Sequence, residues 1–208
     1  MDVSHLSLYQ LTLEKGTKLF EDLPHLRESH NNDLMADFYQ ATTQITKEFG
    51  YFQYEISSFS RSREFRSRHN IGYWNGGDYY GVGPGAHGRR FGEDGKRFRT
   101  FGVLSPNAWM TSCENEGHGI QRLVEMKKGE ISNELILFGL RMNDGILASQ
   151  FECVTGIQLD HAISISKLRQ YIDNGLLTCK SLGGALTTIK CTSPGLLVAD
   201  RIAADLII

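Results

Sequence analysis

Residues 34–56 read LMADFYQATTQITKEFGYFQYEI and contain a helical pattern followed directly by a strand pattern. In the first part, apolar side chains recur with the spacing of one helix face at Leu34, Phe38, Ala41, Ile45 and Phe49. Asn32 or Asp33 can cap the start of this helix, and Gly50 can end it. Apolar and polar residues then alternate, with the apolar positions at Phe52, Tyr54 and Ile56. The stretch therefore predicts a helix over 34–49 and a strand over 52–56.

The preceding segment, residues 6–13, reads LSLYQLTL and is apolar at both alternating sets of positions. This pattern is typical of a strand that is covered on both faces, as in a parallel sheet. With the helix and strand that follow, the order is strand, helix, strand, which predicts a βαβ unit with two parallel strands.

Residues 61–99 differ in charge from the rest of the chain. They contain nine Lys or Arg against four Asp or Glu, a balance of +5, whereas the whole chain has a net charge of −2. Nine of the 22 glycines lie between Gly72 and Gly95. A positive segment rich in glycine and aromatic residues, within an otherwise acidic chain, is a candidate ligand site.

From about residue 105 the pattern becomes helical. Ser105-Pro106 is typical of a helix start, and Ser132 is a candidate cap for a second helix that Gly145 would end. A third helix is expected around Leu168, followed by Asn174-Gly175. Residues 176–179 and 187–191 are expected to form a hairpin around Gly183-Gly184, and a last helix is expected from Pro194. Helix, hairpin and helix in this order predict a winged-helix-like unit.

Composition limits the classes of protein that fit. The chain has 208 residues, of which 40% are hydrophobic, so it is long enough for one or two domains with a real core. The net charge of −2 argues against a uniformly basic nucleic-acid binder. No apolar run approaches the roughly 18 residues of a membrane span, and residues 1–5 lack the features of a signal or transit peptide. We therefore expect no membrane span and no targeting segment in this chain.

The four cysteines, Cys113, Cys153, Cys179 and Cys191, lie 40, 26 and 12 positions apart. Zinc ribbons and iron–sulfur loops need at least two thiolates within a few residues, because the metal fixes their separation. The spacing therefore favours reduced cysteines that act as small apolar residues.

The densest candidate site is the segment His69-Asn70-Ile71-Gly72-Tyr73-Trp74, with a glycine-rich segment after it at residues 81–88. Imidazole binds haem iron, aromatic rings pack on porphyrin faces, and guanidinium groups pair with propionates. These roles could be taken by His69 as iron ligand, by Tyr73 and Trp74 as packing groups, and by Arg66 or Arg68 as propionate partners. The alternative is that both rings are core aromatics and that the histidine is a hydrogen-bonded turn residue.

The glycine-rich segment admits two interpretations. Gly81, Gly83 and Gly85 allow the backbone to approach a planar or anionic ligand closely, or they form a tight connection to a strand. The segment matches neither the dinucleotide fingerprint nor a phosphate-binding P-loop, because Pro84 interrupts it and no Gly-Lys-Ser/Thr follows.

Two other functional classes are disfavoured. A serine or cysteine hydrolase lacks support because the chain has no G-x-S-x-G elbow. DNA binding through the winged-helix-like unit is also disfavoured, because the candidate reading helix at 164–174 has no basic face.

Six segments together resemble the oxygen-independent coproporphyrinogen III oxidase family of radical S-adenosylmethionine (SAM) proteins, and within it the HemW-type haem-chaperone branch. The matching segments, which follow the family's order over nearly the whole chain, are residues 5–17, 50–59, 69–74, 81–87, 133–146 and 192–200. The resemblance implies an α/β plus α+β fold. Residues 1–105 would form the C-terminal part of a partial (β/α)6 barrel, and residues 106–208 would form a HemN-type C-terminal domain.

The resemblance also implies cofactors and partners. His69, within the branch's His-Asn-x-x-Tyr-Trp motif, would bind haem before its transfer to a recipient protein, and Gly81, Gly83 and Gly85 would shape the barrel mouth. The family's [4Fe–4S] cluster, which binds SAM, is held by a Cys-x3-Cys-x2-Cys loop that this sequence lacks. We therefore expect a fragment without radical chemistry and with exposed apolar surface in residues 1–105. The binding partners expected are haem and a haem-receiving protein, with no nucleic acid.

Two further readings remain open at this stage. A full-length parent could be a coproporphyrinogen oxidase-like enzyme with a [4Fe–4S] cluster and SAM, and the fragment itself could be regulatory or inert. The resemblance implies either a cytoplasmic or a mitochondrial compartment.

Overall fold

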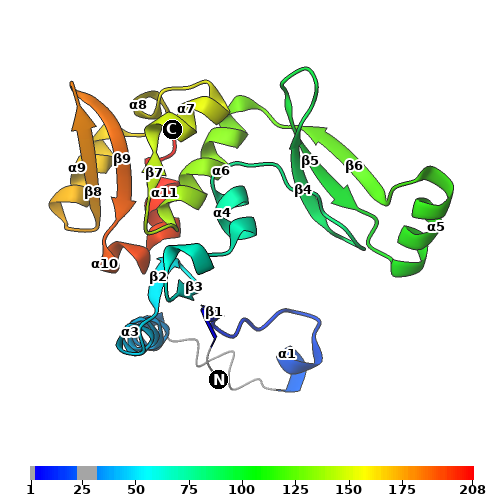
Figure 1. Ribbon diagram of the computed structural model, residues 1–208, viewed down its shortest axis with the longest axis horizontal. Helices are drawn as coiled ribbons and strands as arrows, with labels where there is room; N and C mark the ends of the chain where they lie inside the picture. Colours follow the sequence, from blue (N-terminus) through cyan, green and yellow to red (C-terminus); the bar gives the residue numbers. More distant parts are fainter. Residues whose placement is uncertain (1–2, 23–31) are drawn as a thin grey trace.

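A computed structural model describes residues 3–22 and 32–208 of the chain. The described residues form three small antiparallel sheets with helices around them, as Figure 1 shows. The order of strands is β1-β3-β2 in the first sheet, β4-β5-β6 in the second and β7-β9-β8 in the third. The structure is therefore mixed α/β, as the sequence predicted at the level of class.

The first sheet contains β1 (His5–Ser7), β2 (Phe52–Glu55) and β3 (Ser58–Ser60). Two helices precede β2, namely α1 (Lys18–Asp22) and α3 (Asn32–Glu48). Because β1 and β2 both run antiparallel to β3, they are parallel to each other, but β3 lies between them. The predicted strand–helix–strand order and the parallel direction of the two strands are thus right, but the two strands are not hydrogen-bonded to each other, because β3 separates them.

The first predicted strand is also much shorter than expected. Only residues 5–7 pair with β3, and Leu8, Tyr9 and Leu11 are exposed. In the described part of the chain, β1 has a neighbour on one side only, so the two-sided cover that the pattern of residues 6–13 predicts is not provided. The helix prediction is confirmed, since α3 ends at Glu48 and Gly50 follows with a φ of +80°.

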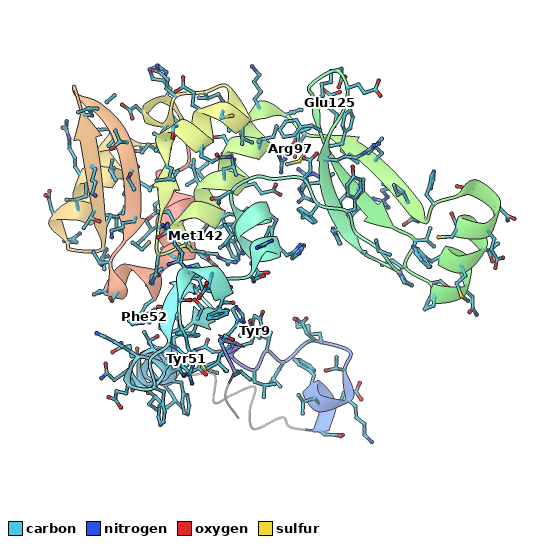
Figure 2. All side chains as sticks on the ribbon, in the orientation of Figure 1. Tyr9, Tyr51, Phe52, Arg97, Glu125 and Met142 are labelled. Carbon is cyan, nitrogen blue, oxygen red and sulfur yellow. The ribbon has the colours of Figure 1, made fainter. Side chains whose placement is uncertain are left out.

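The chain next forms a 3-10 turn η1 (Arg63–Phe65) and the short helix α4 (Arg68–Trp74). The next four elements form a projecting unit that we call the arm. The arm consists of β4 (His87–Phe91), β5 (Arg97–Gly102), α5 (Pro106–Glu116) and β6 (Ile120–Glu125). Figure 1 shows the arm projecting to the right, and Figure 2 labels Arg97 and Glu125 on it. The helix predicted at Pro106 is confirmed. The sequence reasoning missed β6, in which every residue is exposed.

The C-terminal body is built around α6 (Lys128–Leu140), whose Ile136 and Leu140 are fully buried. The other elements of the body are β7 (Ile146–Leu147), α7 (Ala148–Thr155), α8 (Leu159–Ala162), α9 (Ile165–Asp173), β8 (Leu177–Leu182), β9 (Ala185–Cys191), α10 (Ser193–Leu196) and α11 (Ala199–Leu206). Helix α11 packs on α6 and on α9, so one apolar core joins the first and last elements of this body.

Several predictions for the body are confirmed and two boundaries are wrong. The hairpin turn lies at Gly183-Gly184 with φ of +60° and +90°, a conformation that glycine adopts at little cost. Helix α6 begins at Lys128, where the Glu130 carboxylate accepts a hydrogen bond from the Lys127 amide, so Ser132 is a buried interior residue and not a cap. The helix also ends at Leu140, well before Gly145. The predicted last helix is two helices, α10 and α11, separated at residues 197–198.

Candidate functional site

The candidate site lies on α4, which carries residues 69–74. Ser67 caps this helix, since its Oγ accepts a hydrogen bond from the Asn70 amide at 3.2 Å. The Ser67 amide donates to the hydroxyl of Tyr54 at 3.1 Å, and that hydroxyl also contacts His5 Nε2 at 2.8 Å. The fully buried Tyr54 thus ties the start of α4 to both β1 and β2.

His69 lies on the exposed side of α4 beside two phenol rings. Its ring centroid is 5.8 Å from that of Tyr73, one helical turn later, and 6.1 Å from that of Tyr79 at an interplanar angle of 87°. Tyr73 and Tyr79 also contact each other, with centroids 5.6 Å apart. The arrangement leaves an exposed imidazole next to two aromatic surfaces. Tyr79 was not among the residues singled out from the sequence.

Trp74 is buried beneath this pair of tyrosines, with 7% of its surface exposed. Its ring packs against Tyr73 at 5.1 Å and against Phe138 of α6 at 5.2 Å, and the guanidinium of Arg141 lies 5.8 Å from the ring centre. The indole Nε1 is buried and has no hydrogen-bond partner among residues 3–22 and 32–208. In this arrangement Trp74 supports Tyr73 from the core side. Trp74 is therefore a core aromatic residue, as the alternative interpretation of the motif predicts for this ring.

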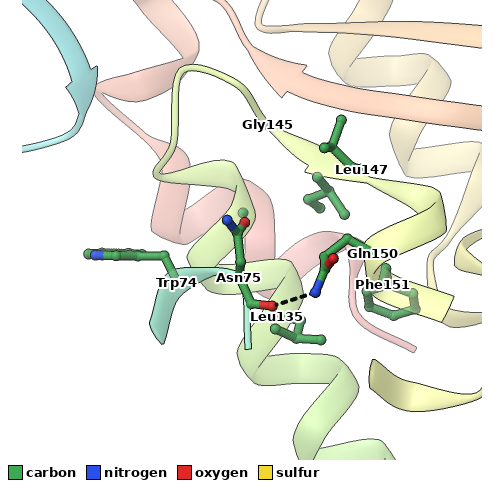
Figure 3. A pocket seen from close by; sticks show the side chains of 9 residues that line it. Trp74, Asn75, Leu135, Gly145, Leu147, Gln150 and Phe151 are labelled. Atoms are coloured by element: carbon green, nitrogen blue, oxygen red, sulfur yellow. Dashed lines mark hydrogen bonds between the residues drawn. The ribbon is translucent and has the colours of Figure 1, made fainter. Parts of the chain in front are cut away.

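A small cavity adjoins Trp74 where α4, α6 and α7 meet. Figure 3 shows it beside Leu135, Gly145 and Gln150, whose side-chain amide donates to the carbonyl of Asn75 at 3.2 Å. Its volume is about 20 Å³, enough for one water, whereas small-molecule sites measure roughly 300–1,000 Å³. A porphyrin therefore does not fit this cavity.

The two candidate arginines differ in their surroundings. Arg66 Nη1 is 2.8 Å from a carboxylate oxygen of Asp144, which also lies 3.7 Å from Arg63. Arg68 is exposed and has no ion pair among the described residues. Arg68 is thus available to an anionic group without breaking an existing contact, whereas Arg66 would have to exchange Asp144 for it.

The glycine-rich segment folds back on the arm. A Cβ on Gly81 would lie 2.5 Å from the carbonyl oxygen of His87, so the chain passes too close to β4 for any side chain. Gly83 and Gly85 have φ of +112° and +69°, and the Gly85 amide donates to the carbonyl of Val103. These contacts fit the interpretation of the segment as a tight connection to a strand. Tyr79, just before it, pairs with Arg89 of β4.

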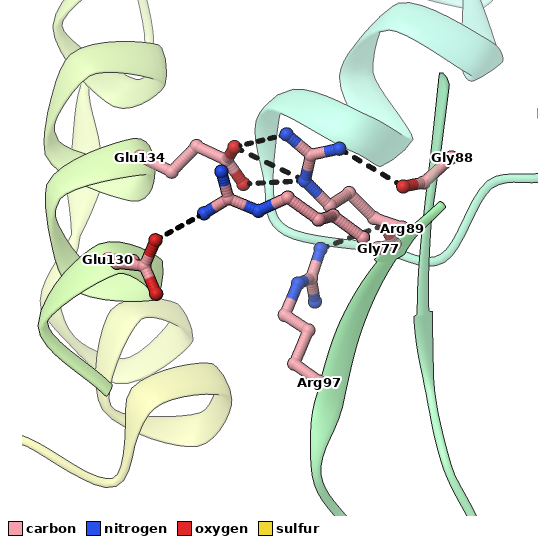
Figure 4. A network of polar contacts seen from close by, with 7 residues as sticks. Gly77, Gly88, Arg89, Arg97, Glu130 and Glu134 are labelled. Carbon is pink, nitrogen blue, oxygen red and sulfur yellow. Dashed lines mark hydrogen bonds and ion pairs between the residues drawn. The ribbon is translucent and has the colours of Figure 1, made fainter. Parts of the chain in front are cut away.

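An arginine network joins the arm to the body, and the sequence reasoning did not find it. Figure 4 shows the guanidinium of Arg89 facing the carboxylate of Glu134, and Nη2 of Arg89 is 2.5 Å from Oε1. In addition, Nη2 of Arg99 is 2.6 Å from Oε1 of Glu130. Arg97, which is 3% exposed, donates to the carbonyls of residues 76 and 77 just after α4. The network therefore fixes the arm relative to both α4 and α6.

The environment shifts the pKa of these groups in opposite directions. Burial lowers the pKa of the Arg97 guanidinium. Burial acts the same way on Arg89, but the hydrogen bonds and charge of Glu134 outweigh it and leave the pKa of Arg89 raised.

Tyr73 has a phenol that resists ionisation. Burial, followed by the negative charge of Glu55 and the neighbouring Tyr79, raises its pKa to about 12. The folded protein therefore holds this proton more tightly than the unfolded chain, so this group's contribution to stability is present below pH 10 and is lost as the pH rises towards 12. At neutral pH Tyr73 is a neutral ring and hydrogen-bond donor.

We expect an ultraviolet titration at 295 nm to show one phenol in the folded chain ionising near pH 12, and we expect Tyr73→Phe to remove that step. Tyr80→Phe, at a tyrosine that is 76% exposed, is the control and should leave the step near pH 12 in place. If Tyr73→Phe keeps the step near pH 12 and loses a different ionisation step, the placement of this ring is wrong.

The four cysteines lie on four different elements, α5, α7, β8 and β9. Burial raises the pKa of the Cys191 thiol to about 12, so it is not a thiolate at neutral pH. Among residues 3–22 and 32–208, no group of three or more His, Cys, Asp or Glu is placed to hold a metal ion. The cysteines among these residues do not fit a [4Fe–4S] cluster.

Several known proteins are similar to this chain in sequence or in fold. The HemN C-terminal domain family matches residues 127–182, the region from α6 to β8. Radical S-adenosyl methionine domain-containing protein 1, mitochondrial, is 34% identical in zebrafish and 36% identical in cattle, in each case over 98% of this chain and 46% of the relative. The heme chaperone HemW of Escherichia coli is 30% identical over 84% of this chain and 46% of its own length.

The chain belongs to the HemN/HemW family of radical SAM proteins. Among solved structures, the coproporphyrinogen III oxidase HemN of Escherichia coli, a radical SAM enzyme, matches with a TM-score of 0.56 at 15% identity, over 81% of this chain and 39% of HemN. At this identity the match shows the fold alone. The chain spans about half the length of the curated relatives it matches.

Within the ranges that the structure describes, no helix is both long enough and apolar enough to cross a membrane.

Proposed function

We propose that this chain is a haem-binding segment of a HemW-type haem chaperone and that His69 is its axial iron ligand. The observation that carries the proposal is the exposed imidazole of His69, flanked by Tyr73 and Tyr79, on a capped helix that the buried Tyr54 holds in place. An imidazole nitrogen is the commonest protein ligand of haem iron. The relatives named heme chaperone HemW support haem as the cargo.

The surroundings of His69 fit a porphyrin that lies on the surface. Tyr73 and Tyr79 offer aromatic area beside the imidazole, and Arg68 offers an exposed guanidinium for a propionate. Arg66 is a second propionate partner if Asp144 is displaced. Direct packing of Trp74 on the porphyrin stays a prediction, as does the role of Gly81, Gly83 and Gly85 in shaping the mouth of a barrel.

An exposed axial histidine suits a protein that carries haem better than an enzyme that keeps its haem. A site that encloses haem binds it by burying most of the haem surface. A site on the protein surface leaves one face of the porphyrin open to a receiving protein. Haem transfer to a receiving protein then needs only an exchange of the axial ligand. Radical SAM chemistry and coproporphyrinogen oxidation are proposals for a longer protein, because the cysteines of this chain do not fit the cluster.

We propose that residues 1–105 contribute to a partial (β/α)6 barrel and that residues 106–208 form a HemN-type domain, in which α9, β8, β9 and α11 make a winged-helix-like unit. Strands β5 and β6 pair across this boundary, so the arm would belong to both parts. We propose a mitochondrial compartment because four of the relatives are named as mitochondrial proteins.

Haem titration followed by the Soret band tests the proposal. We expect His69→Ala to weaken ferric haem binding by about tenfold or more and to change the Soret maximum, because the iron loses its axial nitrogen. His161→Ala, at an exposed histidine on α8, is the matched control and should bind like the wild type. Equal affinity and identical spectra in the two variants would eliminate His69 as the ligand.

A further inference from the structure

The arm carries a second exposed imidazole, at His87, the first residue of β4. Its ring packs against Phe101 of β5, with centroids 4.8 Å apart and an interplanar angle of 68°. Within residues 3–22 and 32–208, neither nitrogen of this ring makes a hydrogen bond. His118, which lies between α5 and β6, differs because its Nδ1 accepts a hydrogen bond from the Ile120 amide. His87 therefore offers a nitrogen to a metal without giving up an existing contact.

His87 belongs to a row of three side chains across the sheet of the arm. His87 pairs with Phe101, and Phe101 pairs with Arg122 of β6, so the three side chains lie on one face of the sheet. Arg122 is exposed and makes no ion pair with the part of the chain that the structure describes. The row spans two strand spacings, about 10 Å, which is close to the width of a porphyrin ring.

The three side chains of the row are the kinds of group that bind haem. An imidazole binds the iron, an aromatic ring packs on the porphyrin, and a guanidinium pairs with a propionate. Helix α4 offers the same three kinds of group at His69, Tyr73 and Arg68. The arm therefore repeats the chemistry of the candidate site on a different element.

The register of β4 places this row beside the candidate site. The backbones of Tyr79 and Arg89 exchange hydrogen bonds of 2.8 and 2.9 Å. Because His87 is two residues before Arg89, His87 and Tyr79 share a face and lie diagonally, with Cα atoms about 7–8 Å apart. The ring of Tyr79 is also 6.1 Å from the ring of His69. The two imidazoles are thus neighbours of the same phenol, one on each side of the junction between α4 and the arm.

The contacts around His87 hold it in place relative to α4. The chain at Gly81 crosses His87 so closely that a Cβ there would lie 2.5 Å from the His87 carbonyl oxygen. The ion pair of Arg89 with Glu134 holds the same strand against α6. The separation between the two imidazoles is therefore set by the fold of the chain.

We propose that His87 is a second haem ligand, which receives haem from His69 before the haem passes to a receiving protein. Phe101 packs on the porphyrin in this second position, and Arg122 pairs with a propionate. The bond between the iron and the His69 nitrogen breaks, the bond between the iron and the His87 nitrogen forms, and the oxidation state of the iron does not change. Each chain holds one haem, in one of two positions. This proposal rests on the haem-binding function proposed above.

Ferric haem titration of histidine variants tests whether His87 binds iron. His69→Ala is expected to keep weak haem binding through His87. Adding His87→Ala is expected to weaken that residual binding by a further tenfold or more and to remove its Soret band, because no axial imidazole is left. His118→Ala in the His69→Ala background is the matched control and should leave the residual binding unchanged.

The outcomes separate this proposal from the proposed function. Equal residual binding in His69→Ala and in the double variant with His87→Ala would overturn the second ligand, and so would complete loss of haem binding in His69→Ala alone. Both results leave His69 as the ligand. A His69→Ala variant that binds haem with the wild-type affinity and spectrum would contradict the proposed function instead.

Haem transfer to apomyoglobin, used as an acceptor with its own Soret band, tests the order of the two ligands. His87→Ala alone is expected to bind haem within about twofold of the wild-type affinity, because His69 is intact, and to transfer it about tenfold more slowly. His118→Ala should transfer haem at the wild-type rate. A His87→Ala variant that transfers haem at or above the wild-type rate would overturn the proposal.

Discussion

Glu134→Ala is expected to lower the free energy of unfolding by about 2–4 kcal/mol, because it leaves the guanidinium of Arg89 largely buried without its partner. The side chains of Arg89 and Glu134 are 13% and 20% exposed, and they make a forked contact between β4 and α6. Water can therefore replace the lost carboxylate only in part. The arm should also lose its fixed position relative to the body.

Urea unfolding measures this effect, with Asn133→Ala as the control at an exposed neighbour on the same helix. The double variant Arg89→Ala with Glu134→Ala is expected to be less destabilised than the sum of the two single variants, because no unpaired charge remains. If Glu134→Ala costs no more than Asn133→Ala, the network does not hold the arm.

Tyr54→Ala is expected to cost about 3–5 kcal/mol, since the ring is fully buried and its loss leaves a cavity. Tyr54→Phe is more informative, because it keeps the ring and removes only the hydroxyl that contacts His5 and accepts from the Ser67 amide. We expect Tyr54→Phe to cost about 1–3 kcal/mol. We also expect it to weaken haem binding, because the start of α4 loses its attachment to the sheet.

The matched control for Tyr54→Phe is Tyr80→Phe, which makes the same change on a ring that is 76% exposed. Urea unfolding and haem titration of both variants separate the two effects. A Tyr54→Phe variant that is destabilised but binds haem normally would show that the attachment of α4 does not influence the site.

Local signals in the sequence predicted local structure well. The paired glycines 183–184 marked a hairpin because both residues need positive φ, and Asn174-Gly175 marked the end of α9. The stripe on residues 34–49 predicted a helix correctly. The same stripe did not predict that this face of the helix is exposed. The helical spacing of apolar residues shows which residues share a face, and it does not show what covers that face.

Contacts between distant residues could not be predicted from the sequence. Arg89 and Glu134 are 45 positions apart, and their pairing depends on how β4 lies against α6. The insertion of β3 between β1 and β2 likewise depends on a two-residue turn after Glu55 that the alternating pattern does not reveal. At the candidate site, the motif drew attention to Tyr73 and Trp74, but only the fold brings Tyr79 to His69 and buries Trp74.

The central claim is that the imidazole of His69 is the group that binds haem iron, and chemical rescue tests it most directly. In His69→Gly the side chain is absent, and the small vacancy on the exposed face of α4 can admit free imidazole. We expect ferric haem bound to His69→Gly to have an altered Soret band, and millimolar imidazole to restore the wild-type band and affinity. If His69→Gly binds haem with the wild-type spectrum before imidazole is added, the iron has another ligand and the claim is wrong.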